Sequence, residues 1–362
     1  MEWKTVKLGE ICKIFTGKKD VNQTIKDGLH PFFSCAPTPY RSNDFIYDGN
    51  VILVAGNGSF TGRVSYYSGK FDLYQRTYAC VPIIDDIDFI YLYFYMKALF
   101  EPQYMGGTRG SSIPYIVRGD LSNFEISLPP LETQRRIAVI LSSLDDKIEN
   151  NNRINANLEA QAQALFKSWF VDFEPWGGVM PEDWKKGNLL DVADLFDHKR
   201  IPLSGMQRDR MEKIYPYYGA TSVMDYVDNY LYDGIYLLMG EDGSVMTDEG
   251  FPFLQYVEGK FWCNNHAHIM QGKNGYTTEM LYCLLNRTNV SGIVTGAVQG
   301  KISQASMKKI PVVLPPAKVC ADMSGKLAPY FDEIRSLRQE SQRLAALRDT
   351  LLPKLMRGEI TL

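Results

Sequence analysis

The sequence predicts an α/β (α+β) protein in which one unit occurs twice. Three observations predict this architecture: short motifs recur in order at a nearly constant offset, a Leu-Pro-Pro sequence precedes a long helical stretch in each half, and both stretches carry an apolar stripe of coiled-coil spacing. We therefore expect two duplicated globular domains separated by two long helices, which pair as an antiparallel coiled coil with pseudo-two-fold symmetry.

The duplication is defined by seven matches that keep their order along the chain, at offsets between 181 and 189 residues. A single match would be noise, but an ordered set at a nearly fixed offset indicates a repeat. The matched pairs are Trp3-Lys4 with Trp184-Lys185, Pro31 with Pro216, Tyr47-Asp48-Gly49 with Tyr232-Asp233-Gly234, Leu53 with Leu238, Tyr91-Leu92-Tyr93 with Met280-Leu281-Tyr282, Gly107 with Gly296, and Leu128-Pro129-Pro130 with Leu314-Pro315-Pro316.

The repeat divides the chain into four parts. Residues 1–130 and 176–316 form the globular domains, called module 1 and module 2 below, and residues 131–175 and 317–362 form the long helices. In module 1, short apolar runs predict buried strands, and Asp88 can cap a helix that runs to Leu99. The predicted strands of module 1 are residues 50–55, 78–83 and 124–128. Module 2 follows the same order in residues 235–239, 267–270, 277–285 and 310–314, where 277–285 corresponds to the helix of module 1.

The long helices are predicted from about Glu132 to about Phe170, and from Leu314-Pro315-Pro316 to about Met356. Their apolar positions step by 4 and 3 without a break, and each helix would be roughly 50–60 Å long. A stripe of this length cannot be buried on one compact domain, so we expect the helices to pair. The seam residues are Ile137, Leu141, Leu144, Ile148, Asn151, Leu158, Leu165, Trp169, Leu327, Ile334, Leu337, Ser341, Leu344, Leu351 and Leu355.

An antiparallel pair is favoured because a whole module must fit between the two helices. Matching the seam midpoints places Asn151 near Ser341, and we expect this polar pair to fix the register at some cost in stability. The alternative is that Asn151 and Asn155 mark a solvated gap where the helices splay. Symmetry would also bring residues 359–362 close to the start of module 1.

The composition is that of a globular protein, with 45% hydrophobic residues, 22% charged residues and a net charge of −3. Module 1 has 13 basic and 13 acidic residues, so any DNA-binding surface must be a local concentration of Lys and Arg. The six cysteines form no CxxC pair, which predicts buried, reduced thiols. No apolar signal core or membrane-spanning run is found, and we expect a cytoplasmic protein without membrane contact.

No catalytic signature is found in the sequence. The P-loop, the GxSxG elbow and the HExxH zinc helix are absent, and Leu precedes both Pro-Pro sites where an adenine methyltransferase needs Asn or Asp. His266 and His268 lie on one face of a predicted strand, where they can either hold a metal or pack. We expect no catalytic residue, no metal and no cofactor bound by this chain.

Without a catalytic signature, the sequence favours a binding protein in which a stiff helical rod holds two similar modules a fixed distance apart. B-DNA offers two equivalent sites at a set spacing, and dimeric DNA-binding proteins mirror that geometry. Because both modules belong to one chain, they can differ and read two different half-sites.

The chain resembles the specificity subunits of type I restriction-modification systems. The run Leu128–Ile137 and residues 144–148 and 164–173 are similar to the central conserved region of that family, and residues 347–358 are similar to its C-terminal region. The second copy departs from the pattern, because Leu314-Pro315-Pro316 is followed by Ala-Lys-Val-Cys rather than by a segment containing Gln-Arg-Arg-Ile.

The resemblance implies a non-catalytic DNA-recognition subunit of a methyltransferase/endonuclease complex. Each module would be a target-recognition domain that reads one half of a bipartite, asymmetric site in double-stranded DNA. The helical rod would set the spacing and dock two methyltransferase subunits, which bind S-adenosylmethionine. Two restriction/translocase subunits, which use ATP and Mg²⁺, would join for restriction.

Candidate DNA contacts follow from side-chain chemistry, because Arg, Lys, Asn, Gln, Ser and Thr read base edges and basic residues hold phosphates. The stretch around Gly58-Ser59 and Gly243-Ser244 can equally be a purely structural turn. The candidates are Arg41, Ser42, Asn57, Ser59, Arg63, Gln75, Arg76, Thr108, Arg109 and Ser111 in module 1, and Thr221, Ser222, Ser244, Asn264, Asn265, His266, Gln299 and Lys301 in module 2, with Lys18, Lys19, Lys199 and Arg200 as further phosphate contacts.

Two other functions are compatible with a duplicated rod. The chain could be a coiled-coil adaptor whose two modules bind proteins. It could also be a nuclease or methyltransferase in its own right, which the missing motifs disfavour.

Overall fold

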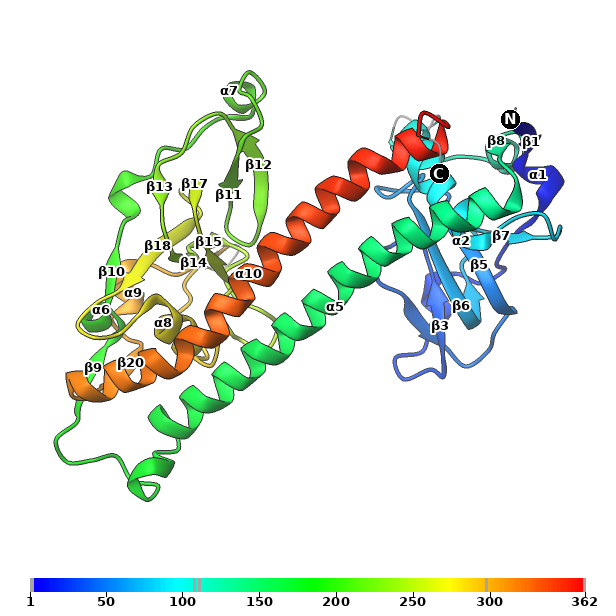
Figure 1. Cartoon of the computed structure of the whole chain (residues 1–362). Coiled ribbons are helices and arrows are strands. Elements are labelled where there is room, and N and C mark those ends of the chain that lie inside the picture. Colours follow the sequence, from blue (N-terminus) through cyan, green and yellow to red (C-terminus); the bar gives the residue numbers. More distant parts are fainter. Residues whose placement is uncertain (1–2, 107–108, 110–111, 297–298, 361–362) are drawn as a thin grey trace. The chain divides into compact units, whose positions relative to one another are not determined.

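The chain folds into two compact units, each formed around one module (Figure 1). The computed structural model describes residues 3–106, 109, 112–296 and 299–360. The first unit combines Met1–Asn150 with Glu340–Leu362, and the second consists of Asn151–Gln339. Each unit therefore contains a module with one part of each long helix, α5 (Leu131–Phe170) and α10 (Ala317–Met356).

Module 1 is built on a six-stranded sheet in the order β2-β7-β5-β6-β3-β4, in which only β3 and β6 pair in parallel. Leu73 at the end of β6 belongs to the same small buried core as Leu53 of β5 and Ala79 of β7. The elements are β1 (Lys4–Lys7), α1 (Leu8–Ile11), β2 (Cys12–Thr16), η1 (Val21–Gln23), β3 (His30–Phe33), β4 (Tyr40–Ser42), β5 (Tyr47–Ala55), β6 (Val64–Leu73), β7 (Thr77–Pro82), α2 (Phe89–Tyr95), η2 (Met96–Phe100), α3 (Glu101–Tyr104), α4 (Arg118–Ser122) and β8 (Glu125–Leu128).

The first Leu-Pro-Pro motif joins module 1 to α5 beside a small antiparallel sheet of β1 and β8. Gln134, in the first turns of α5, is buried. Its amide nitrogen donates to the carbonyl oxygens of Pro129 at 2.9 Å and Asp86 at 3.1 Å, and its amide oxygen accepts from the backbone nitrogen of Asp88 at 2.9 Å. Gln134 thus fixes the start of α5 to the start of α2, where Asp88 is the N-cap, as predicted.

The second Leu-Pro-Pro motif joins module 2 to α10 in the same way, but a different kind of side chain holds this junction. β9 and β20 pair antiparallel, and Cys320 stands six residues after Leu314, as Gln134 stands six residues after Leu128. The buried thiol packs against Gly275, where an added Cβ would lie 3.1 Å from the Cys320 Cβ. This junction is therefore packed, whereas the first one is held by hydrogen bonds.

Module 2 contains two four-stranded sheets, β10-β18-β14-β16 and β12-β11-β17-β13, and the short pair β15-β19. Its regions of strand and helix include every segment predicted from the repeat. The elements are η3 (Glu174–Trp176), β9 (Lys185–Asn188), α6 (Leu189–Val192), β10 (Ala193–Leu195), η4 (Asp197–Lys199), α7 (Gly205–Arg208), β11 (Tyr215–Tyr218), β12 (Val223–Val227), β13 (Tyr232–Asp233), β14 (Tyr236–Gly240), β15 (Asp242–Gly243), β16 (Leu254–Val257), β17 (Lys260–Cys263), β18 (Ala267–Gly272), α8 (Thr278–Leu285), β19 (Gly300–Lys301), α9 (Gln304–Met307) and β20 (Pro311–Leu314).

The long helices bury their ends in the module cores as well as against each other. In the first unit, Ile137 and Leu141 of α5 and Leu355 of α10 belong to the core of module 1. In the second unit, Phe166 of α5 and Leu327 of α10 belong to the core of module 2. The expectation that the stripe is buried only by helix pairing was therefore incomplete, because each module covers one end of it.

Helix pairing itself is antiparallel inside each unit. In the first unit, Asp145 pairs with Arg348 at 2.6 Å and Lys147 pairs with Glu340 at 3.2 Å, so the residue number rises in one helix as it falls in the other. Figure 1 shows the first half of α5 running beside the last part of α10. None of the predicted seam residues is exposed.

The polar centre of the seam is buried, with Asn151 at 0% and Asn155 at 7% exposure, which argues against the solvated gap. The pairing of Asn151 with Ser341 and the two-fold relation between the halves stay predictions. Beyond the end of α10, Ile360 and Trp3 both pack against the core of module 1, so the described part of the predicted stretch 359–362 lies at the start of that module, as expected.

Candidate nucleic-acid interface

Three loops of module 1 meet at one edge of its sheet. The Gly56 nitrogen donates to the Arg76 carbonyl oxygen at 3.0 Å, and the Ile116 nitrogen donates to the Gly56 carbonyl oxygen at 3.0 Å. Asn57 and Arg109 both form backbone bridges with Tyr115. The structure thus brings together three candidates, Asn57, Arg76 and Arg109, that are far apart in the sequence; these loops (residues 56–63, 74–76, 109 and 112–118) are called edge 1.

The remaining candidates near edge 1 are held in different ways. Ser59 is exposed in a turn where Gly58 has a φ of 81°, a conformation that favours glycine. Gln75 is exposed and donates to Asp20 at 2.9 Å. Arg63 turns inward, where its guanidinium donates to the Ala36 carbonyl oxygen at 2.6 Å. Arg109 is exposed and pairs with Asp120 at 2.5 Å, which fixes its direction.

Two candidates of module 1 have internal roles. The Ser42 hydroxyl is buried and donates to Asp72 at 2.7 Å, and the Lys19 ammonium pairs with both Asp44 and Asp72 at 2.7 Å. We therefore do not propose Ser42 or Lys19 as DNA contacts, because their polar atoms are already satisfied. Arg41 is exposed. Thr108 and Ser111 lie outside the described residues.

In module 2 the candidates gather around the short pair of β15 and β19. Asp242 stands opposite Lys301 and Gly243 opposite Gly300 in this antiparallel pair, which places Ser244 and Gln299 at the same end of it. An added Cβ on Gly243 would lie 3.5 Å from the Gln299 amide nitrogen. His266 reaches the same place, because its carbonyl oxygen accepts from the Glu241 nitrogen at 2.8 Å. This pair with its flanking residues 241–244, 264–266 and 299–301 is called edge 2.

Asn264 is the candidate of module 2 that is buried. Its amide nitrogen donates to the Met224 sulfur at 3.2 Å and its amide oxygen accepts from the His266 nitrogen at 2.8 Å. Asn264 thus supports edge 2 with a buried, hydrogen-bonded side chain, and we do not propose it as a base contact. The exposed Thr221 and Ser222 belong to a neighbouring loop, and Asn265 is exposed on edge 2.

A buried cluster of charges supports edge 2. His268 has an exposed fraction of 1%; its Nδ1 donates to Asp197 at 2.6 Å and its Nε2 donates to the Ile302 carbonyl oxygen at 2.7 Å. Arg200 donates to Glu241 at 2.5 Å and to the Ala267 carbonyl oxygen at 2.8 Å. The suggestion that Arg200 contacts phosphate is therefore not supported, since its guanidinium is used inside the module.

Asp197, Glu241 and His268 lie close enough to hold a metal ion, but their hydrogen bonds fit a metal poorly. Both ring nitrogens of His268 face acceptors, and a carbonyl oxygen can only accept, so Nε2 carries a proton and offers no lone pair. Arg200 also brings a positive charge onto Glu241. The charge cluster is therefore a closed ion-pair network, and the packing alternative for His268 is the better one.

The pKa values agree with a charged His268. Burial opposes the charged ring, but the hydrogen bond and charge of Asp197 outweigh it and raise the pKa of His268 above 6.5. Burial likewise opposes the charged form of Asp197, yet its hydrogen bond with His268 keeps the pKa of Asp197 below 3.8. Each charge stabilises the other inside the module.

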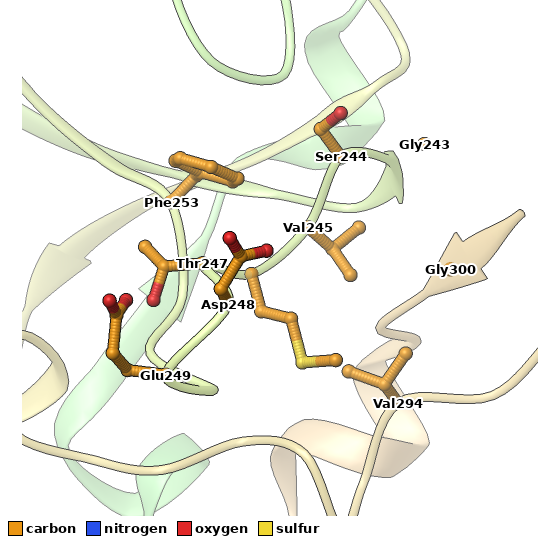
Figure 2. Close-up of a pocket in the computed structure, with 10 residues that line it drawn as sticks. Gly243, Ser244, Val245, Thr247, Asp248, Glu249, Phe253, Val294 and Gly300 are labelled. Carbon is orange, nitrogen blue, oxygen red and sulfur yellow. The ribbon is translucent and has the colours of Figure 1, made fainter. Parts of the chain in front are cut away.

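Beside edge 2 lies an open cavity of about 580 Å³ (Figure 2). Ser244, Val245 and Gly300 line one part of it, and Asp248 and Glu249 come from the loop on the other part. The Thr247 hydroxyl lowers the pKa of Glu249, which keeps this carboxylate charged. Two exposed carboxylates disfavour a phosphate here, so this cavity is not proposed to hold the DNA backbone.

Two of the buried thiols, Cys12 and Cys263, are held in their unreactive form. Burial raises the pKa of Cys12 and of Cys263 to about 12, so both remain protonated and unreactive at neutral pH. Among the described helices, none combines the length and the apolar character that crossing a membrane requires.

Sequence reasoning missed Arg118, an exposed residue at the start of α4 that closes edge 1. A signal was present, because Arg118 is a basic residue nine positions after the candidate Arg109. It also missed the charge cluster, whose members Asp197 and His268 are 71 residues apart in the chain.

Known proteins resemble the chain over its whole length. The family described as "Type I restriction modification DNA specificity domain" matches residues 1–160 and 181–345. The type I restriction enzyme EcoDI specificity subunit of Escherichia coli is 37% identical, with 100% of this chain and 89% of that protein covered. The MjaIX specificity subunit of Methanocaldococcus jannaschii is 25% identical over 75% of this chain and 68% of that protein. The crystal structure of a type I restriction-modification S subunit from M. genitalium has the same fold, with a TM-score of 0.62, 18% identity, and coverage of 98% of this chain and 96% of that one.

Proposed function

The chain belongs to the family of type I restriction-modification specificity subunits, the non-catalytic members of these complexes, and we propose that it reads a bipartite, asymmetric DNA target with one half-site per module. Edge 1 would contact one half-site and edge 2 the other. Because the two edges carry different side chains, the two half-sites would differ in sequence.

The observation that carries this proposal is the convergence of polar loops at one edge in each duplicate. In module 1 the convergence unites Asn57, Arg76 and Arg109, and in module 2 it unites Ser244 and Lys301. Side chains that can donate to base edges and phosphates gather there although the sequence separates them. Stabilising the hydrophobic core alone would not require these polar side chains to lie together.

The two long helices would set the distance between the half-sites and dock the catalytic partners. The outer face of α5 supports docking, because Arg135, Arg136, Val139 and Ile140 line an open hollow of about 460 Å³ with Glu132, and Val139 is 66% exposed. Exposed apolar side chains rimmed by charges are typical of protein-binding surfaces.

The partners would be double-stranded DNA, two methyltransferase subunits and two restriction/translocase subunits. S-adenosylmethionine would be bound by the methyltransferase subunits, and ATP with Mg²⁺ by the translocase subunits. This chain would bind none of these cofactors, because its own contribution is sequence recognition.

The test is a binding experiment with the complex of the full chain and its methyltransferase partner. Duplexes with the target sequence should bind at least about 10³-fold more tightly than random duplexes, and both affinities should fall steeply with salt. Equal affinity for target and random duplexes at moderate salt would contradict the proposal.

A further inference from the structure

A small open pocket lies at edge 1 of module 1. It measures about 370 Å³ and is called the cationic pocket. It is lined by Phe15, Thr16, Gln75, Arg76, Tyr78 and Arg118.

The charge of the cationic pocket is not neutralised by the protein. Arg76 and Arg118 are exposed, and in the part of the chain that the structure describes neither guanidinium has an ion-pair partner. The neighbouring carboxylate of Asp120 is engaged by Arg109 at 2.5 Å. Burial raises the pKa of Tyr78, while both Arg76 and Arg118 act in the opposite direction, so both cations lie within electrostatic reach of its hydroxyl.

The chemistry of the lining fits a phosphate group. Arg76 and Arg118 can only donate hydrogen bonds, and a guanidinium matches two oxygens of a phosphate in its fork. Thr16 adds a hydroxyl donor at the wall of the pocket. In protein–DNA complexes, half or more of the hydrogen bonds go to the sugar–phosphate backbone, and Arg is a main source of them.

The pairing register of the strands identifies the position in module 2 that is equivalent to the cationic pocket of module 1. In module 1, Thr16 stands opposite Tyr78, and Tyr78 stands opposite Val54 of β5. In module 2, His268 stands opposite Met239 of β14 in the same way. Continuing the register of β10 and β18 by two residues sets Asp197 opposite His268, and the 2.8 Å hydrogen bond from the Phe196 nitrogen to the Ile269 carbonyl oxygen supports this continuation.

Asp197 and His268 therefore occupy the positions of Thr16 and Tyr78. Gln304 begins the short helix α9 before the last strand of module 2, as Arg118 begins α4 before the last strand of module 1. Gln304 donates to Asp197 at 2.8 Å. The place that is an open, positive pocket in module 1 is thus closed by internally paired charges in module 2.

We propose that Arg76 and Arg118 bind a backbone phosphate of the half-site read by module 1, and that module 2 makes no such contact because its charge cluster fills the equivalent position. This inference rests on the proposed DNA-reading function. It assigns Arg118 to DNA binding. It also implies that DNA binding by module 1 depends more on phosphate contacts than DNA binding by module 2.

The test compares salt dependence for the full chain in complex with its methyltransferase partner. Replacing Arg118 by Gln removes one of the two cations that hold the phosphate, so the slope of log affinity against log salt should become shallower by up to about 0.9, with a similar loss on target and random duplexes. Arg76→Gln should do the same. Arg118→Lys keeps the charge, so it should keep the slope while weakening the fork-like contact.

Lys70→Gln is the matched control, since it removes a positive charge from module 1 at a side chain that lies over the Phe45 ring, outside the pocket. It should leave the slope and the affinity unchanged. The inference is overturned if Arg118→Gln and Arg76→Gln, both with wild-type melting temperatures, keep the wild-type slope, or if they change base preference at constant slope. A wild-type complex that does not prefer its target would instead refute the proposed function.

Discussion

At the scale of single residues, Gln134 and Cys320 explain how the two copies of the junction differ. Gln134 satisfies three backbone groups at the start of α5, and Cys320 fills the equivalent place with a buried thiol against Gly275. A buried amide with three partners fixes direction, whereas a thiol packs without directional bonds. The departure seen in the second motif thus has a structural compensation.

We predict that Gln134→Leu lowers the free energy of unfolding by about 3 kcal/mol, because two carbonyl oxygens and one backbone nitrogen lose their buried partner. Denaturant unfolding of the full chain measures this loss. Glu132→Gln is the control: it removes only an exposed pair with Arg136 and should change stability by less than about 0.5 kcal/mol. Equal effects of the two changes would contradict the role given to Gln134.

The charge cluster predicts a pH dependence of stability. Asp197→Asn leaves a buried charge on His268 without its partner and should cost about 3 kcal/mol near pH 6. The raised pKa of His268 means that its contribution is complete below about pH 6.5 and is lost as pH rises through the folded pKa, and the lowered pKa of Asp197 means that its contribution is complete above about pH 4. The other charged groups near the ring are Arg200 and Glu241, which pair with each other at 2.5 Å.

The difference between wild type and Asp197→Asn should therefore be largest between about pH 4 and pH 6.5 and should shrink at higher pH. Chemical unfolding at a series of pH values measures it. A difference that does not change with pH would show that His268 is not charged in the folded state.

At the scale of elements, the long helices take their positions from two kinds of packing. The first half of α5 is held by module 1 and by the antiparallel contact with α10, in which Asp145 pairs with Arg348. The second half of α5 enters the core of module 2 through Phe166 and Phe170. The helix α5 therefore takes part in both hydrophobic cores.

We predict that Leu141→Ala, at a fully buried seam position, lowers the free energy of unfolding by about 2–5 kcal/mol through lost burial and a residual cavity. Val139→Ala, two residues away on the same helix and 66% exposed, should change it by less than about 0.5 kcal/mol. Thermal unfolding of both variants gives the comparison. A small effect at Leu141 would mean that this part of the stripe does not contribute to the core of the first unit.

The elements show which parts of the fold the sequence could predict. Helix ends and the seam were predictable, because Pro129-Pro130 and Gly358 act locally and the 4-3 spacing is a local pattern. Strand β6 (Val64–Leu73) was not predicted, since its central residues Tyr66 to Lys70 mix exposed aromatic, Ser and Gly residues with no clear apolar alternation. Its parallel pairing with β3 joins residues far apart in the sequence, such as Phe32 and Asp72, and no short window of sequence contains both.

The candidate site shows the same limit. Residue types and loop positions predicted Asn57, Arg76 and Arg109, which the structure brings together. They could not separate exposed polar residues from satisfied ones, so Ser42 and Asn264 were included although both are buried. That distinction depends on partners far away in sequence, such as Asp72 for Ser42.

At the scale of the whole molecule, duplication gives one chain two separate modules. Each module has its own sheet, its own core and its own polar edge. Divergence has then made the edges unlike: module 1 keeps the open cationic pocket, and module 2 closes the equivalent place with the charge cluster. Two unlike edges on one chain are suited to an asymmetric target.

The most direct test is to map the methylated sites in DNA from cells that carry the complex with the wild-type chain, and from cells in which residues 1–130 are replaced by module 1 of another member of the family. We predict that the wild-type motif has two parts separated by a fixed gap, and that the exchange changes one part while the other part and the gap are retained. A motif in which both parts change, or a motif unaffected by the exchange, would contradict the assignment of one half-site to each module.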